Sequence, residues 1–179
     1  MIRTVLIALL LCGYAGAQEV LATFPEVSGS NLEEQEYTLP QDFEGELNLV
    51  LVAFTQGQQA QVDTWLSYAE ELDTEGLRVY ELPVLGRSYR LLRSVIDGGM
   101  RSGISDPVAR ARTITLYGDK PAFMEALNMP SERTIYALLV NAAGEVLWQV
   151  DGEHTREKAA GLEQILNKAK LPANYDGGL

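Results

Sequence analysis

One stretch of the sequence limits the folds that this chain can adopt. Residues 47–54 form a near-continuous apolar run, which is typical of a buried strand covered on both faces. Residues 58–72 then place apolar side chains on one face of a helix: Val62, Trp65, Leu66, Ala69 and Leu72. Residues 77–82 predict a second strand, which we expect to stop at Pro83. This order predicts two parallel strands joined by a right-handed helical crossover.

The middle of the chain is predicted to be helical but interrupted. Residues 88–96 have a helical pattern that places four side chains on one face: Tyr89, Leu92, Val95 and Ile96. The Asp-Gly-Gly sequence at 97–99 is expected to break this helix, and 100–107 to form a loop. One more helical turn is predicted at 108–111, ahead of a short strand at 113–117.

The last third predicts a short helix, a hairpin and a closing helix. Asp119 is expected to cap the short helix, and Asn128 to close it in a left-handed conformation. Residues 134–140 and 145–150 predict antiparallel strands joined by a tight turn. Thr155 is expected to cap the final helix. Together the segments predict an α/β domain.

The N-terminus has the pattern of a secretory signal peptide. Arg3 precedes an apolar run that is too short to span a bilayer, and Ala15-Gly16-Ala17 forms a small-residue cleavage site before Gln18. The alternative is an N-terminal anchor that stays uncleaved. We therefore expect a periplasmic or otherwise exported protein with no membrane span after signal cleavage.

The sequence divides into four predicted parts. These are a signal peptide at 1–17, an N-terminal extension at 18–36, one domain at 37–170 and a flexible tail at 171–179.

Composition and charge limit the partners. The formal net charge is −11, and cleavage would also remove the positive charge of Arg3. An acidic protein of this kind repels nucleic acid, so we expect no nucleic-acid partner.

The residues resemble thioredoxin-like proteins, and among them the peroxiredoxin branch. Leu39-Pro40-x-Asp42-Phe43-x-Gly45 is similar to the lead-in of that branch, residues 49–54 to its first core strand, and 134–147 to its hairpin. The resemblance covers roughly residues 37–169. It implies an α/β fold with a thioredoxin-like central mixed sheet flanked by helices, here with an arginine-rich helical insertion.

A weaker resemblance is to the mitochondrial ATP-synthase assembly-factor family. It rests on the Tyr-x-Leu-Leu-Val pattern at 136–140 and on Gly98-Gly99-Met100-Arg101. It implies a chaperone-like role in the assembly of membrane complexes.

The redox site of thioredoxin-like proteins has no counterpart here. The family places its cysteine between the first core strand and the helix, where the helix N-terminus stabilises a thiolate. This chain has glutamines at that junction, at 56–59, and its only cysteine, Cys12, lies in the expected signal peptide. The nearest match to the family's cis-proline, Pro130, is offset, with Glu132 and Arg133 in the expected place. We therefore expect neither a thiol oxidoreductase nor a peroxidase, and no cofactor.

Arginine is concentrated in one segment. Residues 87–112 hold six of the chain's ten arginines, with two acids and no lysine. Arginine suits bidentate recognition of carboxylate or phosphate groups. The predicted binding residues are Arg87, Arg90, Arg93, Asp97, Arg101, Arg110 and Arg112. The alternative is that these arginines neutralise the protein's own carboxylates.

Two functions of different classes follow from these residues. The leading hypothesis is a non-redox binding or assembly module of the cell envelope, which docks an acidic protein surface or a small anionic ligand through the arginines. The alternative is an enzyme acting on a small anionic substrate, with Asp97, Arg101 and Arg112 lining a pocket near residues 56–59. The lone His154 predicts no metal site. The oligomeric state is left open.

Overall fold

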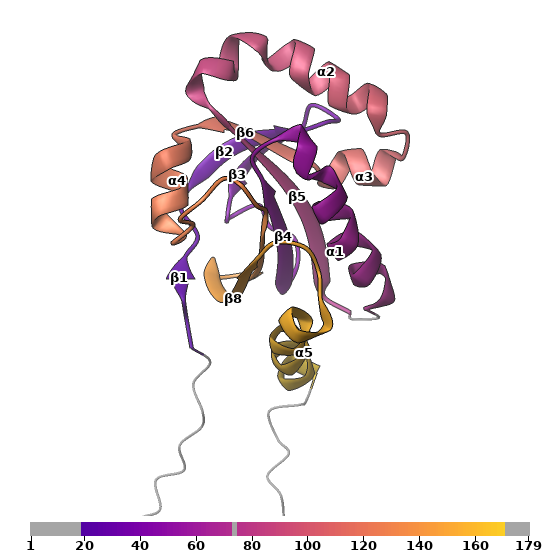
Figure 1. The fold of residues 1–179 in the computed structure, drawn as a ribbon, viewed down its shortest axis with the longest axis vertical. Helices are drawn as coiled ribbons and strands as arrows, with labels where there is room; N and C mark the ends of the chain where they lie inside the picture. Colours follow the sequence, from indigo (N-terminus) through magenta and orange to yellow (C-terminus); the bar gives the residue numbers. More distant parts are fainter. Residues whose placement is uncertain (1–18, 73–74, 171–179) are drawn as a thin grey trace, which may run out of the picture.

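The computed structural model describes residues 19–72 and 75–170, and its centre is an eight-stranded mixed sheet (Figure 1). The strand order is β1-β8-β7-β4-β5-β6-β2-β3. The strands are β1 Ala22–Thr23, β2 Val27–Asn31, β3 Glu36–Leu39, β4 Leu47–Ala53, β5 Leu77–Gly86, β6 Ile114–Gly118, β7 Tyr136–Asn141 and β8 Glu145–Asp151. The helices are α1 Gln59–Glu71, α2 Arg93–Gly103, α3 Pro107–Arg112, α4 Lys120–Ala126 and α5 Arg156–Lys170, with short 3₁₀ helices η1 Gln56–Gln58 and η2 Arg87–Leu92.

The predicted strand–helix–strand unit is confirmed. β4 and β5 pair in parallel from Leu47 and Leu77 onward, and α1 connects them. The predicted hairpin is confirmed as well, because β7 and β8 pair in antiparallel fashion. On β4, Leu49 and Leu51 face one side of the sheet, and the alternate residues face the other, as the two-residue period of a strand requires.

Two hydrophobic layers cover the two faces of the sheet. On one face, α1 and α5 bury Trp65 and Leu162 against Leu49 and Leu51. On the other face, Phe123 of α4 packs with Phe24, which comes from the chain before β2. The fold therefore has the predicted central mixed sheet flanked by helices.

The segment at 18–36, which was expected to be an extension ahead of the domain, contributes strands to the sheet. β1 pairs with β8, and β2 pairs with both β3 and β6. At Gly29 a Cβ atom would lie 2.6 Å from the carbonyl oxygen of Thr115, so the absence of a side chain allows β2 to lie close to β6. The expected signal peptide at 1–17 and the tail at 171–179 lie outside the described residues.

The second predicted strand is longer than expected, because β5 continues past Pro83 to Gly86. Pro83 is the last residue that pairs with β4, and Val84 is the first that pairs with β6. A proline lacks the N–H group that a strand ladder uses, and it is tolerated here where the strand changes neighbours.

The prediction that 97–99 break the helix is wrong. η2 leads into α2, which continues through Gly98 and Gly99 to Gly103, so the expected loop at 100–107 begins only after α2. Glycine inside a helix costs about 1 kcal/mol relative to alanine. Contacts with the rest of the fold, made by Arg93, Asp97 and Arg101, hold both halves of the helix in place.

The insertion, residues 87–112, comprises η2, α2 and α3. In Figure 1 it lies across the end of the molecule that is opposite α5. The predicted apolar face of 88–96 does not pack into the core, because α2 buries none of its side chains. Within the described residues, no helix has the length and apolar character needed to cross a membrane.

Candidate functional site

A buried glutamine occupies the junction where thioredoxin-like proteins carry their cysteine. Gln58 is only 6% exposed. Its Oε1 accepts hydrogen bonds from the backbone N–H groups of Phe54 (2.8 Å) and Thr55 (3.2 Å), and its Nε2 donates to the carbonyl oxygen of Glu132 (2.9 Å). The side chain therefore ties the end of β4 to the segment ahead of β7. Because buried polar groups need such partners, this is a structural role.

A second glutamine on α1 makes a similar connection. Oε1 of Gln61 accepts from the Thr134 hydroxyl at 3.3 Å and from the Ile135 N–H at 3.4 Å. In the described part of the chain, the cis peptide bond precedes Pro40 and not Pro130. The junction thus holds backbone segments together, and residues 55–60 contain no cysteine.

Three of the predicted arginines bind acids in the turn between β2 and β3 or at the first residue of β3. Arg93 contacts Glu36 at 3.0 Å, Arg101 contacts Glu34 at 3.2 Å, and Arg110 contacts Glu33. The hydrogen bond from Arg110 lowers the pKa of Glu33. The alternative that the arginines neutralise the protein's own carboxylates therefore describes these three.

The same arginines also bind backbone and neutral groups. Nε of Arg101 donates to the carbonyl oxygen of Leu32 at 2.6 Å, and Arg110 donates to that of Ile104 at 3.2 Å. Arg93 contacts the Ser30 hydroxyl. These bonds fix α2 and α3 against β2, so the three arginines hold the insertion on the sheet.

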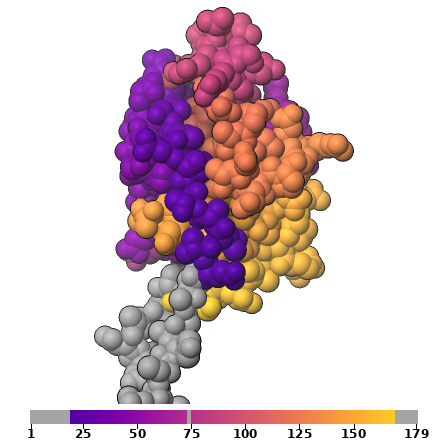
Figure 2. Space-filling model, turned by 90° about the vertical axis from the view of Figure 1, so that its left-hand side faces the viewer, coloured from indigo at the N-terminus to yellow at the C-terminus, as the bar shows by residue number. Residues whose placement is uncertain are grey.

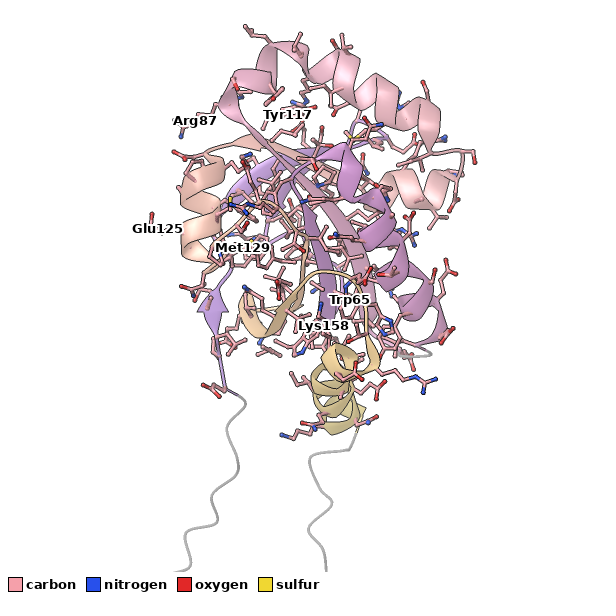
Figure 3. All side chains as sticks on the ribbon, in the orientation of Figure 1. Trp65, Arg87, Tyr117, Glu125, Met129 and Lys158 are labelled. Carbon is pink, nitrogen blue, oxygen red and sulfur yellow. The ribbon has the colours of Figure 1, made fainter. Side chains whose placement is uncertain are left out.

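Asp97 faces the fold and not solvent. It lies 3.4 Å from Arg93 and accepts a 2.7 Å hydrogen bond from the hydroxyl of Tyr117 on β6. Burial, together with this hydrogen bond, raises the pKa of Tyr117. In Figure 3 Tyr117 lies beneath the insertion, whereas Arg87 lies at its outer edge.

Arg112 lies beside a buried acid. Its Nε is 3.7 Å from Glu81 on β5, which is only 6% exposed, and Gln59 donates a 3.3 Å hydrogen bond to the same carboxylate. Burial raises the pKa of Glu81, and the neighbouring Gln59 and Arg112 oppose that shift only in part. The pair links the last residue of α3 to β5.

Replacing Glu81 by glutamine should change how stability depends on pH. The pKa of the Glu81 carboxyl is raised in the fold. Its contribution to the free energy of unfolding is therefore fully present below the ordinary pKa of 4.5 and is lost as the pH rises through the pKa in the folded protein. We therefore expect Glu81→Gln to gain stability relative to wild type between pH 4.5 and 7, measured by urea unfolding. Glu70→Gln, at an exposed site on α1, is the control. A wild-type advantage that grows toward pH 7 would contradict this expectation.

The two remaining arginines are directed outward. Arg87 contacts Asp119 at 3.3 Å, and both side chains are largely exposed. Arg90 is exposed and makes no hydrogen bond or ion pair with any residue that the structure describes. Of the six predicted arginines, Arg90 is therefore the one available to an outside group without breaking an existing contact.

Exposed apolar side chains lie close to these two arginines in the chain. Leu91 is 95% exposed and Val95 is 72% exposed, and Tyr89 and Leu92 are about half exposed. We call these four residues of η2 and α2 the apolar face of the insertion. Exposed apolar residues that cluster in this way are typical of interaction sites.

A hollow of about 370 Å³ borders Arg87 and Arg90, next to α4. It includes no residue of the glutamine junction at 56–59, and none of Asp97, Arg101 and Arg112 lines it. This hollow is therefore not the pocket that the enzyme alternative places near residues 56–59. The residues that sequence reasoning missed are the acids at 33, 34 and 36. The dense run of acids at 33–36 could have pointed to them, but it was assigned to the predicted N-terminal extension.

Among the described residues, no group of three or more histidine, cysteine or acidic side chains could hold a metal ion. His154 is half-buried and stacks on Tyr68, with the ring centres 4.3 Å apart.

Comparison with solved structures identifies the fold. A protein of Aquifex aeolicus VF5, described as a candidate for electron transfer, matches with a TM-score of 0.58 at 10% identity, over 88% of this chain and 98% of that chain. The exposed lipoprotein thioredoxin Etrx1 of Streptococcus pneumoniae TIGR4 matches with a TM-score of 0.54 at 11% identity, over 80% and 99%. BsSco, of the Sco family of cytochrome c oxidase assembly proteins, matches with a TM-score of 0.52 at 14% identity, over 86% and 95%.

At these identities the likeness establishes the fold alone. The predicted thioredoxin-like fold is confirmed. No family model and no curated protein matches the sequence. The weaker resemblance to ATP-synthase assembly factors is not shown by these comparisons.

Proposed function

We propose that this thioredoxin-like protein is a non-redox binding or assembly module of the cell envelope, which docks a protein partner through the apolar face of its insertion. The observation that carries the proposal is the exposure of Leu91 and Val95 on a segment that arginines hold firmly to the sheet. Apolar side chains on a fixed support lose little conformational entropy on binding, which favours affinity.

The partner is a protein surface whose apolar residues are edged by carboxylates. Arg90 has no partner among the described residues, and Arg87 has only the exposed Asp119. Both side chains can therefore bind a carboxylate of another molecule. The formal net charge of −11 disfavours acidic surfaces over the molecule as a whole, which favours contact with such a partner where Arg87 and Arg90 lie. In this form of the arginine hypothesis, two of the six arginines contact the partner, and the other four pair with acids of the protein itself.

The glutamine junction supports a role without thiol chemistry. Gln58 and Gln61 occupy the site with hydrogen bonds to backbone, and the only cysteine of the chain is Cys12. The envelope location is proposed from the signal-peptide pattern. It agrees with the exposed lipoprotein among the structural neighbours.

Affinity capture with a matched pair of variants tests the proposal. Tagged protein from Gln18 onward, as wild type and as Leu91→Ser/Val95→Ser, is incubated with an envelope extract of the producing organism, and retained proteins are identified. Both replaced side chains are exposed, so we expect the variant to fold normally. The control is Val20→Ser/Leu21→Ser, which alters two exposed apolar residues near β1.

The captured partner is then purified and its dissociation constant measured. We expect Leu91→Ser/Val95→Ser and Arg90→Glu each to weaken binding by about tenfold or more, because the first removes apolar contacts at the centre and the second reverses a charge. The control should bind like wild type. Equal binding by wild type and both test variants would overturn the proposal, as would capture of no protein.

A further inference from the structure

We propose that the hollow beside η2 is a binding site for a carboxylate carried on a short apolar chain. The hollow measures about 370 Å³, which is at the lower end of the range for small-molecule sites. Figure 2 shows the side of the molecule where the N-terminal segment, the insertion and α4 lie next to one another, and residues of all three line the hollow. The inference goes beyond the proposed docking function and does not depend on it.

The sheet itself creates this space. The ladder between β2 and β6 has two residue pairs, Ser30–Thr115 and Asn31–Ile114, and no further pairs. The hollow lies beyond the end of this ladder, between Pro25–Ser28 on one side and Leu116–Gly118 on the other. β5 and β6 are parallel and both end here, and the carboxyl ends of parallel strands are the usual place for ligands in open α/β sheets.

The inner wall is apolar. Val84 of β5, Leu116 of β6 and Phe123 of α4 border the hollow, and all three are buried in the core beneath it. Pro25 and Val27 line the side formed by the N-terminal segment. A ligand that enters the hollow would therefore place a short hydrocarbon chain on these side chains and gain free energy from its burial.

The rim has an excess of positive charge in a protein that is otherwise acidic. Arg87, Arg90 and Lys120 line the hollow together with two acids, Glu26 and Asp119. Asp119 is occupied, because its carboxylate caps α4 through the N–H of Ala122 and also contacts Arg87. Glu26 accepts from the side chain of Gln41 at 3.2 Å.

Lys120 is also paired, with Glu132. Arg90 therefore remains as the cation at the rim that has no partner among the described residues. A guanidinium above an apolar wall selects a ligand with one carboxylate at the end of a hydrocarbon chain, because the fork of N–H donors matches the two carboxylate oxygens.

The same chemistry could come from a free aliphatic acid or from the carboxyl terminus of an apolar peptide. Octanoate represents the first source, and acetyl-Ala-Leu-Val with a free carboxylate represents the second. Octanol and the carboxamide of the same peptide keep the apolar part and lack the charge. Titration calorimetry or amide chemical shifts would give the dissociation constants.

Two variants act on different parts of the site. Arg90→Ala removes the cation, and Ala122→Phe places a ring in the hollow from an exposed position on α4. The second variant leaves the apolar face of the insertion unchanged, so failure of this site and failure of the docking proposal are distinguishable. Arg156→Ala, on the exposed side of α5, is the matched control for Arg90→Ala.

We expect at least one of the two carboxylates to bind saturably, and its uncharged analogue to bind about tenfold more weakly or not at all. Arg90→Ala and Ala122→Phe should each weaken binding about tenfold, and Arg156→Ala should not change it. Binding of octanoate alone would identify a free acid, and binding of the peptide alone a peptide terminus. No binding by either probe, binding of the uncharged analogues as tight as that of the carboxylates, or binding by Arg90→Ala and Ala122→Phe as tight as that of wild type would overturn the proposal.

Discussion

The triple variant Arg93→Glu/Arg101→Glu/Arg110→Glu should detach the insertion from the sheet. Each substitution removes an ion pair and places a new carboxylate beside Glu36, Glu34 or Glu33. It also removes donors to the backbone carbonyl groups of Leu32 and Ile104. The hydrogen bond from Tyr117 to Asp97 would remain, but α2 buries none of its own side chains to support it. We expect amide hydrogen exchange across 87–112 to become faster by about tenfold or more, while the central strands keep their protection.

A variant with the same change in charge separates this effect from general repulsion. Arg78→Glu/Arg133→Glu/Arg156→Glu alters three exposed arginines that have no ion pair among the described residues. Its exchange pattern should match that of wild type within the insertion. If the two triple variants exchange alike at 87–112, the arginine contacts do not hold the insertion, and the structural role assigned to them is wrong.

Trp65→Ala should cause the largest loss of stability by a single substitution. The side chain is fully buried between α1, the sheet and α5, and its Nε1 donates a 2.9 Å hydrogen bond to the carbonyl oxygen of Gly152. Its ring packs edge-on against Trp148, with the ring centres 5.6 Å apart. Truncation of a buried tryptophan costs about 3–5 kcal/mol, because it loses the transfer free energy and leaves a cavity.

For a domain of this size, such a loss lowers the melting temperature by roughly 10 °C. Differential scanning calorimetry would measure it. Tyr89→Ala is the matched control, since Tyr89 is an aromatic residue that is about half exposed on η2, and its removal should shift the melting temperature by no more than about 2 °C. A small shift in Trp65→Ala would mean that the layer of α1 and α5 carries little of the stability.

Local patterns were sufficient where a segment's own residues decide its structure. The apolar run of β4 and the helical period of α1 predicted the strand–helix–strand unit, because backbone hydrogen bonding imposes a fixed period on each element. Asp119 caps α4 as expected, accepting from the N–H of Ala122, and Asn128 has the expected left-handed backbone at φ 51°. Caps and turns of this kind depend on neighbours within a few residues.

The candidate site depended on contacts between distant residues. The Asp-Gly-Gly sequence predicted a break, yet α2 continues, because Arg93 and Arg101 bind groups near residues 30–36. Likewise, the helical pattern of 88–96 placed Tyr89 and Val95 on one face, and in the structure both side chains are exposed to solvent. Helical period identifies a common face, but it does not say against what that face packs.

The sequence by itself determined the α/β architecture and the absence of a cysteine at the redox junction, because both follow from residues that are adjacent in the chain. The tertiary structure alone decided which arginines are available. Arg101 meets Glu34 and Arg110 meets Glu33 only because β2 joins the sheet beside β6, and this pairing brings residues more than 60 positions apart into contact. The composition shows how many arginines the segment has, but ion pairing depends on distances of a few ångströms, which composition does not give. The fold therefore assigns Arg93, Arg101, Arg110 and Arg112 to its own acids and leaves Arg90 free among the described residues.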